Sequence, residues 1–370
     1  MIIKNGLVLK GDFTFEQTDI EFDDKIIGIA KNDGEDFFDA SGCYVVPGLV
    51  DTHFHAAMGE TFIDFNEDTA KIITEFELKN GTTSMVPAIS AAPEEKMTKA
   101  VKYLLEQMKK HPSIRGIHLE GPFFAPKFKG AHLPENIRVP SVEEAERLID
   151  AGEGAGKRIT MAPELPGGFE TVRYITSRGV TVSVGHSDAT FEQATDAFAC
   201  GATQTTHTFN AMSPLNHRAP GLAGAAMAED VNCELICDFF HIHKDVVKLM
   251  FKVKGADKIN MITDSEVGTG MPDGEFSVNG RTLTVRDKKT FTEDGTIAGG
   301  TSVLLDGVRN VVTLGVPLAD ALKTATINPA RAAGIDSIAG SLEIGKSADI
   351  LVLDSQPEIK AVFFAGKRIV

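Results

Sequence analysis

The sequence contains little cysteine, and its few cysteines are not arranged as a metal or redox motif. Only four of the 370 residues are cysteine, at positions 43, 200, 233 and 237, and no two of them are spaced as Cys-x-x-Cys. Reduced intracellular thiols are the simplest interpretation of this usage. A chain of this length buries roughly three quarters of its unfolded surface, so it needs no disulfides to hold a fold together.

Long apolar runs are also missing from the sequence. No segment approaches the roughly 20 consecutive apolar residues that are needed to cross a membrane. The first residues, Met1-Ile2-Ile3-Lys4, do not have the pattern of a signal peptide. We therefore expect a cytoplasmic protein that does not bind membranes.

The sequence has fewer basic residues than acidic residues. The chain has 37 Lys and Arg residues against 52 Asp and Glu residues, which gives a net charge of −15. This balance argues against nucleic acids and anionic membrane surfaces as partners. It does not exclude a small anionic ligand, which responds to the groups near it, but such a ligand requires basic residues gathered at its site.

Short strands at the start of the chain give way to a long alternation of strands and helices. Residues 1–46 predict a small antiparallel sheet, because strand-like runs are separated by turn residues such as Asp23-Asp24 and Asn32-Asp33-Gly34. Buried strands are then predicted at 47–55, 82–89, 114–120, 159–164, 180–186, 202–207, 233–241 and 258–264. Helices are predicted between them at 69–79, 93–110, 141–156, 169–178, 190–200 and 243–253. Eight strand–helix units indicate a parallel (β/α)8 TIM barrel, with an open doubly wound sheet as the alternative.

The pattern changes again after residue 264. Hairpin strands are predicted at 275–278, 282–285 and 296–298, followed by helices at 301–314 and 318–327. The C-terminal segment returns to strands, and we expect it to complete the N-terminal sheet. The predicted organisation is an α/β fold with two domains: a small β-sandwich domain from residues 1–48 and 340–370, and a catalytic barrel from residues 49–339.

Side chains suited to metal binding stand at the ends of six predicted strands. One such feature, the pair His53 and His55, could equally be two hydrogen-bonded core histidines. The rim of a barrel at the C-terminal strand ends, however, gathers all of these residues, and this is where barrel enzymes place their active sites. The set consists of five imidazoles and two carboxylates: His53, His55, Glu120, His186, His207, His241 and Asp264.

Imidazole and carboxylate ligands predict a divalent metal centre. They suit zinc, iron, manganese or cobalt, and the lack of cysteine ligands argues against a purely structural zinc. A bound divalent ion can lower the pKa of water from about 16 to about 7 and so supply hydroxide at neutral pH. Asp264 is then a candidate general base, a metal ligand, or both.

Several longer motifs resemble those of the amidohydrolase superfamily, and within it the N-acetylglucosamine-6-phosphate deacetylase family. The similarity extends over nearly the whole chain, including the return from Gly340 to Asp349. The motifs that carry it are His53-Phe54-His55, His118-Leu119-Glu120-Gly121-Pro122, Gly185-His186-Ser187-Asp188-Ala189-Thr190, His207-Thr208-Phe209-Asn210-Ala211-Met212, Arg218-Ala219-Pro220-Gly221-Leu222-Ala223-Gly224 and Thr263-Asp264.

The resemblance implies a binuclear or mononuclear metal centre. Glu120, His186 and His207 match the ligands of the primary metal. His53 and His55 match members that hold a second metal bridged by the glutamate. The metal is expected to be zinc or iron, one or two ions per subunit, and Asp264 matches the catalytic acid/base as well as a possible ligand.

The resemblance also implies a phosphorylated amino sugar as the substrate. His132 matches the histidine that polarises the acetyl carbonyl, and His241 and Arg218 match the phosphate contacts. The arginine of the family reaches across from the other subunit of a homodimer. Asn210 and Ala211 match backbone that also meets the phosphate. The expected reaction is removal of the acetyl group from N-acetylglucosamine 6-phosphate, through attack of metal-activated hydroxide on the acetamide.

Three local departures bear on specificity rather than on the metal chemistry. Ala56-Ala57 follows the histidine pair, Phe239-Phe240 precedes His241, and Ser265-Glu266 follows Asp264. The additional carboxylate of Glu266 could favour another N-acetyl-hexosamine 6-phosphate, such as the galacto epimer. The other possibilities are a cyclic-amide hydrolase, a deaminase and a non-catalytic scaffold. The first usually has a carbamylated lysine ending strand four, where this chain has Glu164, and the last typically loses ligands.

Overall fold

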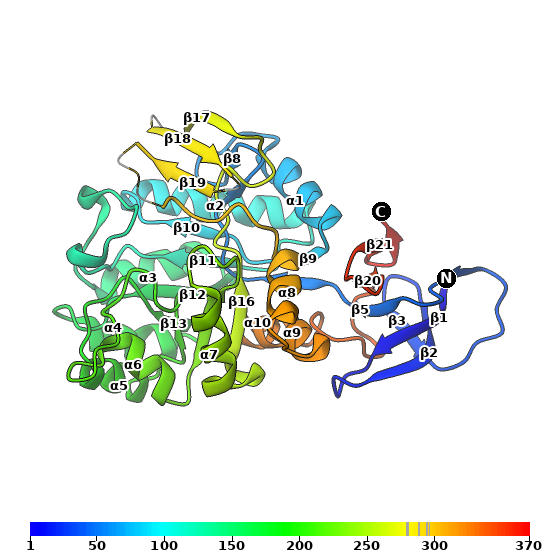
Figure 1. Cartoon of the computed structure of the whole chain (residues 1–370). Helices are drawn as coiled ribbons and strands as arrows, with labels where there is room; N and C mark the ends of the chain where they lie inside the picture. The colour runs from blue at the N-terminus through cyan, green and yellow to red at the C-terminus, as the bar shows by residue number, and fades with distance from the viewer. Residues whose placement is uncertain (279–280, 288, 294, 296) are drawn as a thin grey trace.

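The computed structural model describes residues 1–370 apart from 279, 280, 288, 294 and 296. A barrel of parallel strands surrounded by helices forms the larger part, and a separate sheet that contains both termini lies against one end of it (Figure 1). Among the residues so described, no helix is both long and apolar enough to cross a membrane.

Eight strand positions form the barrel, as the sequence predicts. The strands run parallel and in chain order: β6 (Leu49–Asp51), β9 (Thr82–Met85) continued by β10 (Ala88–Ser90), β11 (Ile117–Glu120), β12 (Gly156–Met161), β13 (Thr181–Val184), β14 (Gln204–Thr205), β15 (Asn232–Ile236) and β16 (Ile259–Ile262). The Asp264 amide donates to the His53 carbonyl at 2.9 Å, which joins the end of the last strand to the end of the first. This closure excludes the open sheet.

The second strand is broken in the middle. β9 pairs with β6, and β10 pairs with β11, while Val86-Pro87 lies between them. Proline has no N–H to give to a ladder, so a single uninterrupted strand is disfavoured at this point. The predicted strand 82–89 is therefore two short ones.

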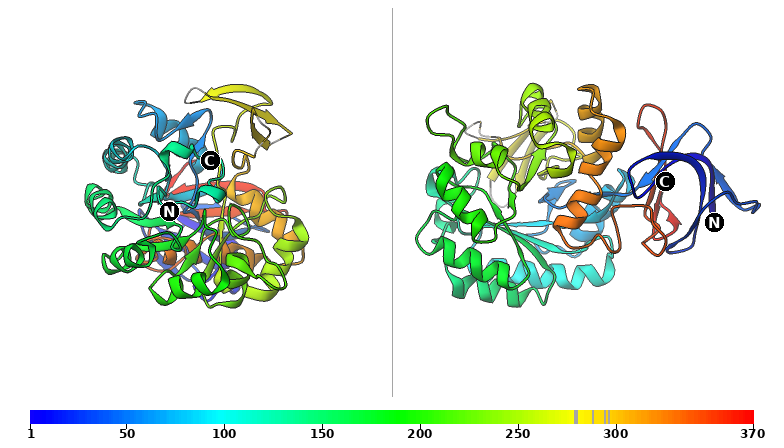
Figure 2. Two further views of the ribbon diagram at one scale, coloured as in Figure 1. Left: turned by 90° about the vertical axis from the view of Figure 1, so that its left-hand side faces the viewer. Right: turned by 90° about the horizontal axis from the view of Figure 1, so that it is seen from below.

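Helices cover the outside of the barrel (Figure 2). Ser141 and Thr190 accept hydrogen bonds at the starts of α3 and α5 from the amides of Glu144 and Gln193. The sequence did not predict the helix α6, because its Gly/Ala-rich sequence lacks helical periodicity. The single helix predicted at 318–327 is divided in the structure into α9 and the start of α10. The helices are α1 (Thr69–Lys79), α2 (Glu94–Lys110), α3 (Val142–Ala151), α4 (Gly168–Ser177), α5 (Phe191–Ala199), α6 (Gly221–Ala228), α7 (Lys244–Lys254), α8 (Leu304–Thr313), α9 (Leu318–Thr324) and α10 (Ile327–Ala332), with short 3₁₀ turns η1 (Pro126–Phe128), η2 (Pro134–Asn136) and η3 (Ala256–Lys258).

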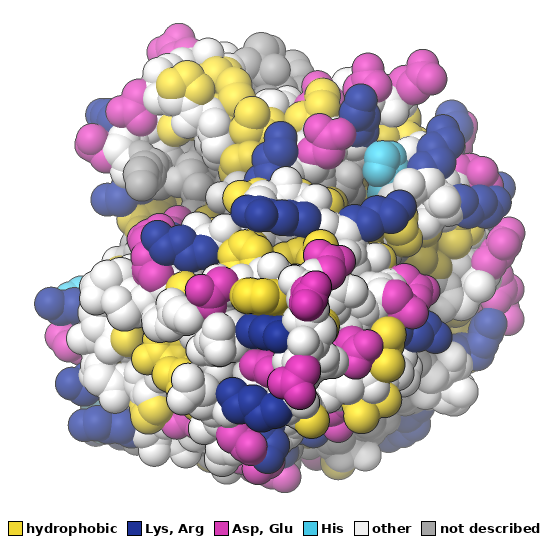
Figure 3. All heavy atoms as spheres, turned by 90° about the vertical axis from the view of Figure 1, so that its right-hand side faces the viewer, with side chains coloured by type: hydrophobic (Ala, Val, Ile, Leu, Met, Phe, Trp, Pro, Cys, Tyr) yellow, Lys and Arg dark blue, Asp and Glu magenta, His cyan; other side chains and the backbone are white. Residues whose placement is uncertain are grey.

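Strands from both ends of the chain pair in one sheet. Its order is β22-β21-β20-β5-β1-β2-β3, with β4 paired to β1. The sheet folds over on itself, since Phe22 and Phe363 come from non-adjacent strands and yet their ring centroids are 5.3 Å apart. Basic and acidic side chains are interspersed on this end of the molecule (Figure 3). The strands are β1 (Ile2–Leu9), β2 (Phe15–Phe22), β3 (Ile26–Ile29), β4 (Phe37–Asp39), β5 (Tyr44–Pro47), β20 (Ile350–Leu353), β21 (Ile359–Phe364) and β22 (Lys367–Arg368).

Two small hairpin elements stand over the barrel mouth. One pairs β7 (Ala56–Ala57) with β8 (Glu60–Thr61), and the other is the sheet of β17 (Gly274–Val278), β18 (Arg281–Arg286) and β19 (Lys289–Thr292). Of the hairpin strand predicted at 296–298, Ile297 forms an antiparallel bridge with Phe291 of β19, and the Ala298 amide donates to the Thr290 carbonyl at 3.0 Å. The sequence did not predict the strand β19 itself. Residue 296 itself is outside the described part of the chain.

Candidate active site

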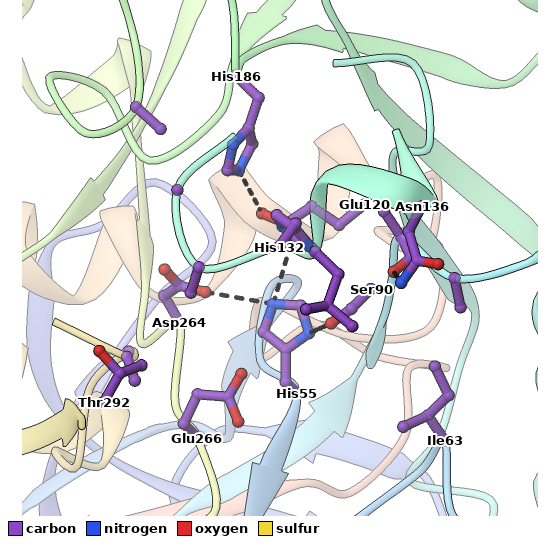
Figure 4. A pocket seen from close by; sticks show the side chains of 18 of the residues that line it. His55, Ile63, Ser90, Glu120, His132, Asn136, His186, Asp264, Glu266 and Thr292 are labelled. Carbon is purple, nitrogen blue, oxygen red and sulfur yellow. Dashed lines mark hydrogen bonds and ion pairs between the residues drawn. The ribbon is translucent and has the colours of Figure 1, made fainter. Parts of the chain in front are cut away.

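A cavity of about 740 Å³ opens at the C-terminal ends of the barrel strands. Its wall includes residues from the first, third, fifth, sixth and eighth strand ends and from the loops between them. Figure 4 shows His55, Glu120, His132, His186 and Asp264 directed toward one another in this cavity. The strand-end residues therefore do meet, as the barrel prediction requires.

Glu120, the last residue of β11, lies at the centre of the cluster. Its Oε1 is 3.2 Å from the Nε2 atoms of His53 and His207 and 3.3 Å from that of His186. Its Oε2 is 3.2 Å from the Nε2 atoms of His55 and His132. One buried carboxylate is thus surrounded by five imidazoles, far more than it could use as hydrogen-bond donors.

The outer nitrogens of the cluster imidazoles are already engaged. The Nδ1–H of His186 donates to the Phe128 carbonyl at 2.8 Å, and that of His207 donates to the Asn210 carbonyl at 3.2 Å. These bonds place the proton on Nδ1, so each Nε2 presents a lone pair to the centre. The two Nε2 atoms are only 3.0 Å apart.

This arrangement fits a metal ion. Two lone pairs at such a separation repel each other unless a cation lies between them. The buried Nε2 of His53 has no hydrogen-bond partner either, although an orphaned buried nitrogen is costly. The ligand-type atoms of His53, His55, Glu120 and Asp264 all lie within 4.8 Å of one another, as do those of Glu120, His132 and His186.

Burial and close charges set the protonation of the cluster. Burial acts to raise the pKa of Glu120, but the charges of His53 and His55 outweigh it and hold that pKa well below its usual value. The pKa of Asp264 is lowered in the same way, chiefly by His53. Burial lowers the pKa of His186 and of His207. For these four residues the shifts favour the ionised carboxylates and neutral imidazoles that bind metals. Burial acts to lower the pKa of His55 as well, but the charge of Glu120 outweighs it, so that this pKa is instead raised.

The backbone at three strand ends turns sharply to direct the side chains inward. His186, His207 and Asp264 have φ angles of 50°, 29° and 49°, in the left-handed region that non-glycine residues seldom adopt. Each stands two residues after its strand, after β13, β14 and β16. Such strain is common where a site needs a fixed geometry.

One predicted detail of the histidine pair is wrong. β6 ends at Asp51, so His53 and His55 lie in the extended segment beyond it and not in a strand. The segment keeps the alternation, because both Nε2 atoms reach Glu120 while Phe54 packs into the apolar core on the other side. The Asp51 side chain helps to hold this segment by accepting from the His53 amide at 3.1 Å.

The sequence of the chain matches the amidohydrolase family over residues 44–369. The chain belongs to the amidohydrolase family. Among similar proteins, the N-acetylglucosamine-6-phosphate deacetylase of Haemophilus influenzae is 36% identical over 89% of this chain and 87% of its own length. The N-acetylgalactosamine-6-phosphate deacetylase of Escherichia coli O157:H7 is 32% identical, over 87% of this chain and 86% of its own length.

A solved structure agrees with the whole fold of this amidohydrolase. It is a variant of the N-acetyl-D-glucosamine-6-phosphate deacetylase from Mycobacterium smegmatis in complex with N-acetyl-D-glucosamine-6-phosphate. It superposes with a TM-score of 0.95 at 32% identity, covering 100% of this chain and 99% of that one. The predicted family resemblance and barrel fold are confirmed.

Several residues outside the strand-end cluster also line the amidohydrolase cavity. His132, Asn210, Ala211 and His241 all line it. Asp238, which no sequence argument had singled out, fixes His241: its Oδ2 accepts from the His241 Nδ1 at 2.7 Å, and its Oδ1 accepts from the His241 amide at 2.9 Å. Burial acts to lower the pKa of His241, but Asp238 outweighs it, so that the pKa is raised and the imidazole is more often cationic.

Arg218 is not brought into the cavity of its own subunit. It is exposed in the segment between β14 and α6 and is absent from the cavity wall. Its predicted role, reaching a neighbouring subunit, stays a prediction. Phe239 and Phe240 also lie off the wall, and the Phe240 ring packs on His241 with centroids 5.3 Å apart.

Glu266 lines the cavity as the sequence analysis anticipated. Figure 4 shows its carboxylate beside His55 and Asp264. Burial raises its pKa to about 7, and the charges of His55 and Asp264 act on it in opposite directions. Gly299 makes room for it, since a Cβ at that position would lie 2.3 Å from the Glu266 Cγ.

Two buried charges behind the cluster are missing from the sequence analysis. Glu234 in β15 and Arg158 in β12 lie inside the barrel, with 0% and 1% of their side chains exposed. Their signal is present in the sequence: a charged residue within an otherwise apolar buried strand is rare unless it is paired.

Proposed function

We propose that this amidohydrolase removes the acetyl group of N-acetylglucosamine 6-phosphate, giving glucosamine 6-phosphate and acetate. The observation that carries the proposal is that the histidine–carboxylate cluster and His241 line the same cavity. The cluster suits hydrolysis of an amide, and His241, which is hydrogen-bonded to Asp238, suits an anion. The relatives that share the whole fold bear the same activity in their names.

The metal is assigned to the cluster residues. Glu120, His186 and His207 would hold the primary ion. His53, His55 and Glu120 would hold a second one, and Asp264 lies within 4.8 Å of these three. Zinc or iron is the expected metal. A divalent ion bound there would act as a Lewis acid and would lower the pKa of a bound water molecule to about 7.

Asp264 is assigned the proton transfer, and His132 is assigned the stabilisation of the carbonyl oxygen. The carboxylate of Asp264 takes a proton from the attacking water and returns it to the nitrogen that leaves as the amine. The His132 Nε2–H is directed into the cavity and would donate to the carbonyl oxygen as negative charge develops there. Neither role requires a change in the barrel, because both side chains already face the cluster.

The phosphate is assigned to the part of the cavity that His241 lines. The His241 imidazole, whose pKa is raised by Asp238, would pair with the phosphate, and the backbone at Asn210 and Ala211 would donate to it. Arg218 would complete the phosphate site of a neighbouring subunit in a homodimer. A cytoplasmic location remains part of the proposal.

One experiment decides the substrate class. Acetate release is measured from N-acetylglucosamine 6-phosphate, from N-acetylgalactosamine 6-phosphate and from unphosphorylated N-acetylglucosamine. We expect the phosphate to raise kcat/KM by about a hundredfold or more, as for a charge-assisted contact of about 3 kcal/mol. Equal rates for the phosphorylated and unphosphorylated sugars would contradict the assignment of His241 to the phosphate.

The galacto epimer is the second candidate. It is supported by the similarity to the Escherichia coli enzyme named for that substrate and by Glu266 on the cavity wall. The same assay separates the two epimers. A cyclic-amide hydrolase has less support: β12 does contain Lys157, but near its N-terminal end, away from the cluster, and Glu164 hydrogen-bonds Ser187 at 2.7 Å.

A further inference from the structure

Glu234 lies directly beneath the histidine cluster, inside the barrel. It projects from β15 and its side chain is fully buried. Every hydrogen bond it makes reaches a different part of the barrel: the segment after β6, the strand β12, the strand β14 and the turn after β14. A buried carboxylate with so many partners is expensive unless each bond is formed.

One oxygen of Glu234 holds two of the cluster residues at once. Its Oε2 accepts from the Nδ1–H of His53 at 3.0 Å. The same atom accepts from the backbone amide of His207 at 3.2 Å. The other oxygen, Oε1, accepts from Gln204 Nε2 at 3.2 Å and pairs with the guanidinium of Arg158.

These two bonds act on different halves of the proposed metal centre. The bond to His53 fixes the tautomer whose Nε2 lone pair faces the second metal position. The bond to the His207 amide stabilises the backbone of His207, whose φ is 29°. It therefore keeps the turn in which the His207 ring is directed at the primary metal position. Any movement of the Glu234 carboxylate therefore displaces both halves.

We propose that Glu234 is a positioning residue that couples the two metal positions. It sets the affinity at the His53/His55 position and links it to occupancy of the Glu120/His186/His207 position. Arg158 neutralises the buried carboxylate and is held in turn by Thr52, whose Oγ1 accepts from Nη2 at 3.1 Å. The inference rests on the metal assignment of the proposed function, not on the identity of the sugar.

The test is a metal titration of chelator-treated protein. Zn²⁺ affinity and stoichiometry are measured by competition with a chromophoric chelator for the parent and for Glu234→Gln. The parent should bind two equivalents. In Glu234→Gln, the affinity for the second equivalent should fall by about 10- to 100-fold, the usual effect of removing a partner of a ligating histidine.

Two further variants guard against a general loss of structure. Glu234→Gln leaves Arg158 buried without a counter-charge, so the paired variant Glu234→Gln/Arg158→Met is titrated beside it and should show the same weakening. Arg158→Met alone keeps the carboxylate on His53 and should retain the second equivalent. Circular dichroism checks that each variant is folded.

The action of Glu234 on the primary position is measured in a His53→Ala background. That substitution should abolish the second equivalent, and adding Glu234→Gln should then shift the first equivalent by a few-fold through His207. The proposal is overturned if the parent binds one equivalent only, if Glu234→Gln binds both as the parent does, or if Arg158→Met loses the second equivalent equally. A parent that binds two ions but releases no acetate would instead contradict the proposed function.

Discussion

A buried carboxyl on the outer wall of the barrel should make the stability of this protein depend on pH. Glu77 lies in α1 and is 2% exposed, and among the described residues its Oε2 has no hydrogen-bond partner. Burial raises its pKa to about 8, and the charge of the nearby buried Asp51 adds to the rise. At neutral pH the folded protein therefore holds a proton that the unfolded chain releases.

The sign follows from where the protons are bound. Between the unfolded pKa of about 4.5 and the folded pKa of about 8, the native state binds more protons than the unfolded state, so stability falls as pH rises. Integrating that difference from about pH 5 to about pH 7.5 gives a loss of about 3 kcal/mol. Glu77→Gln cannot titrate and should not suffer this loss.

Urea unfolding at the two pH values measures the effect. Relative to the parent, the free energy of unfolding of Glu77→Gln should rise by about 3 kcal/mol between about pH 5 and about pH 7.5. Glu75→Gln is the matched control, because Glu75 lies on the same helix and is exposed; it should follow the parent at both pH values. A gap between Glu77→Gln and the parent that is the same at both pH values would refute the reasoning.

Three more predictions concern the site. Asp264→Asn keeps the shape of the side chain but cannot carry the proton, so acetate release should fall by about a hundredfold or more; activity within a few-fold of the parent would exclude the acid/base role. Subunits with Arg218→Ala mixed at random with subunits carrying Asp264→Asn should regain about a quarter of parental activity, because half of the dimers are mixed and each has one complete site. No recovery would place Arg218 outside the neighbouring site. Chelation should lower the Tm of the parent by several degrees, since bound metal stabilises only the folded state. It should lower the Tm of His186→Ala by less, because that variant lacks a ligand of the primary ion; equal shifts in scanning calorimetry would argue against His186 as a ligand.

Local pattern was a good guide to the elements of this fold. The helix predicted at 69–79 has the same bounds in the structure, and the helices predicted to begin at 141 and 190 do begin there, with Ser141 and Thr190 as their N-caps. These predictions succeed because periodicity and helix starts depend on neighbouring residues alone. The helix α6 was missed because its Gly/Ala-rich sequence carries no such local signal.

The residues that reach the cavity were also largely readable from the sequence. Parallel strands in a barrel place all their C-terminal ends on one rim, so residues far apart in the chain can be gathered by topology alone. His53, His186 and His207 meet Glu120 in this way, and Asp264 lies within 4.8 Å of the ligand atoms of His53 and Glu120. Arg218 is not gathered in this way, since its predicted site belongs to another subunit.

The barrel, the amidohydrolase motifs and the set of side chains at the strand ends can all be predicted from local sequence. The way in which those side chains are held depends on contacts that form only in the folded protein. Left-handed turns direct His186 and His207 inward, Asp238 fixes His241, and Glu234 binds His53 and His207 through a single oxygen. The reason is that motifs mark single chain segments, whereas these bonds join residues separated by up to 181 positions and depend on where each strand ends in space.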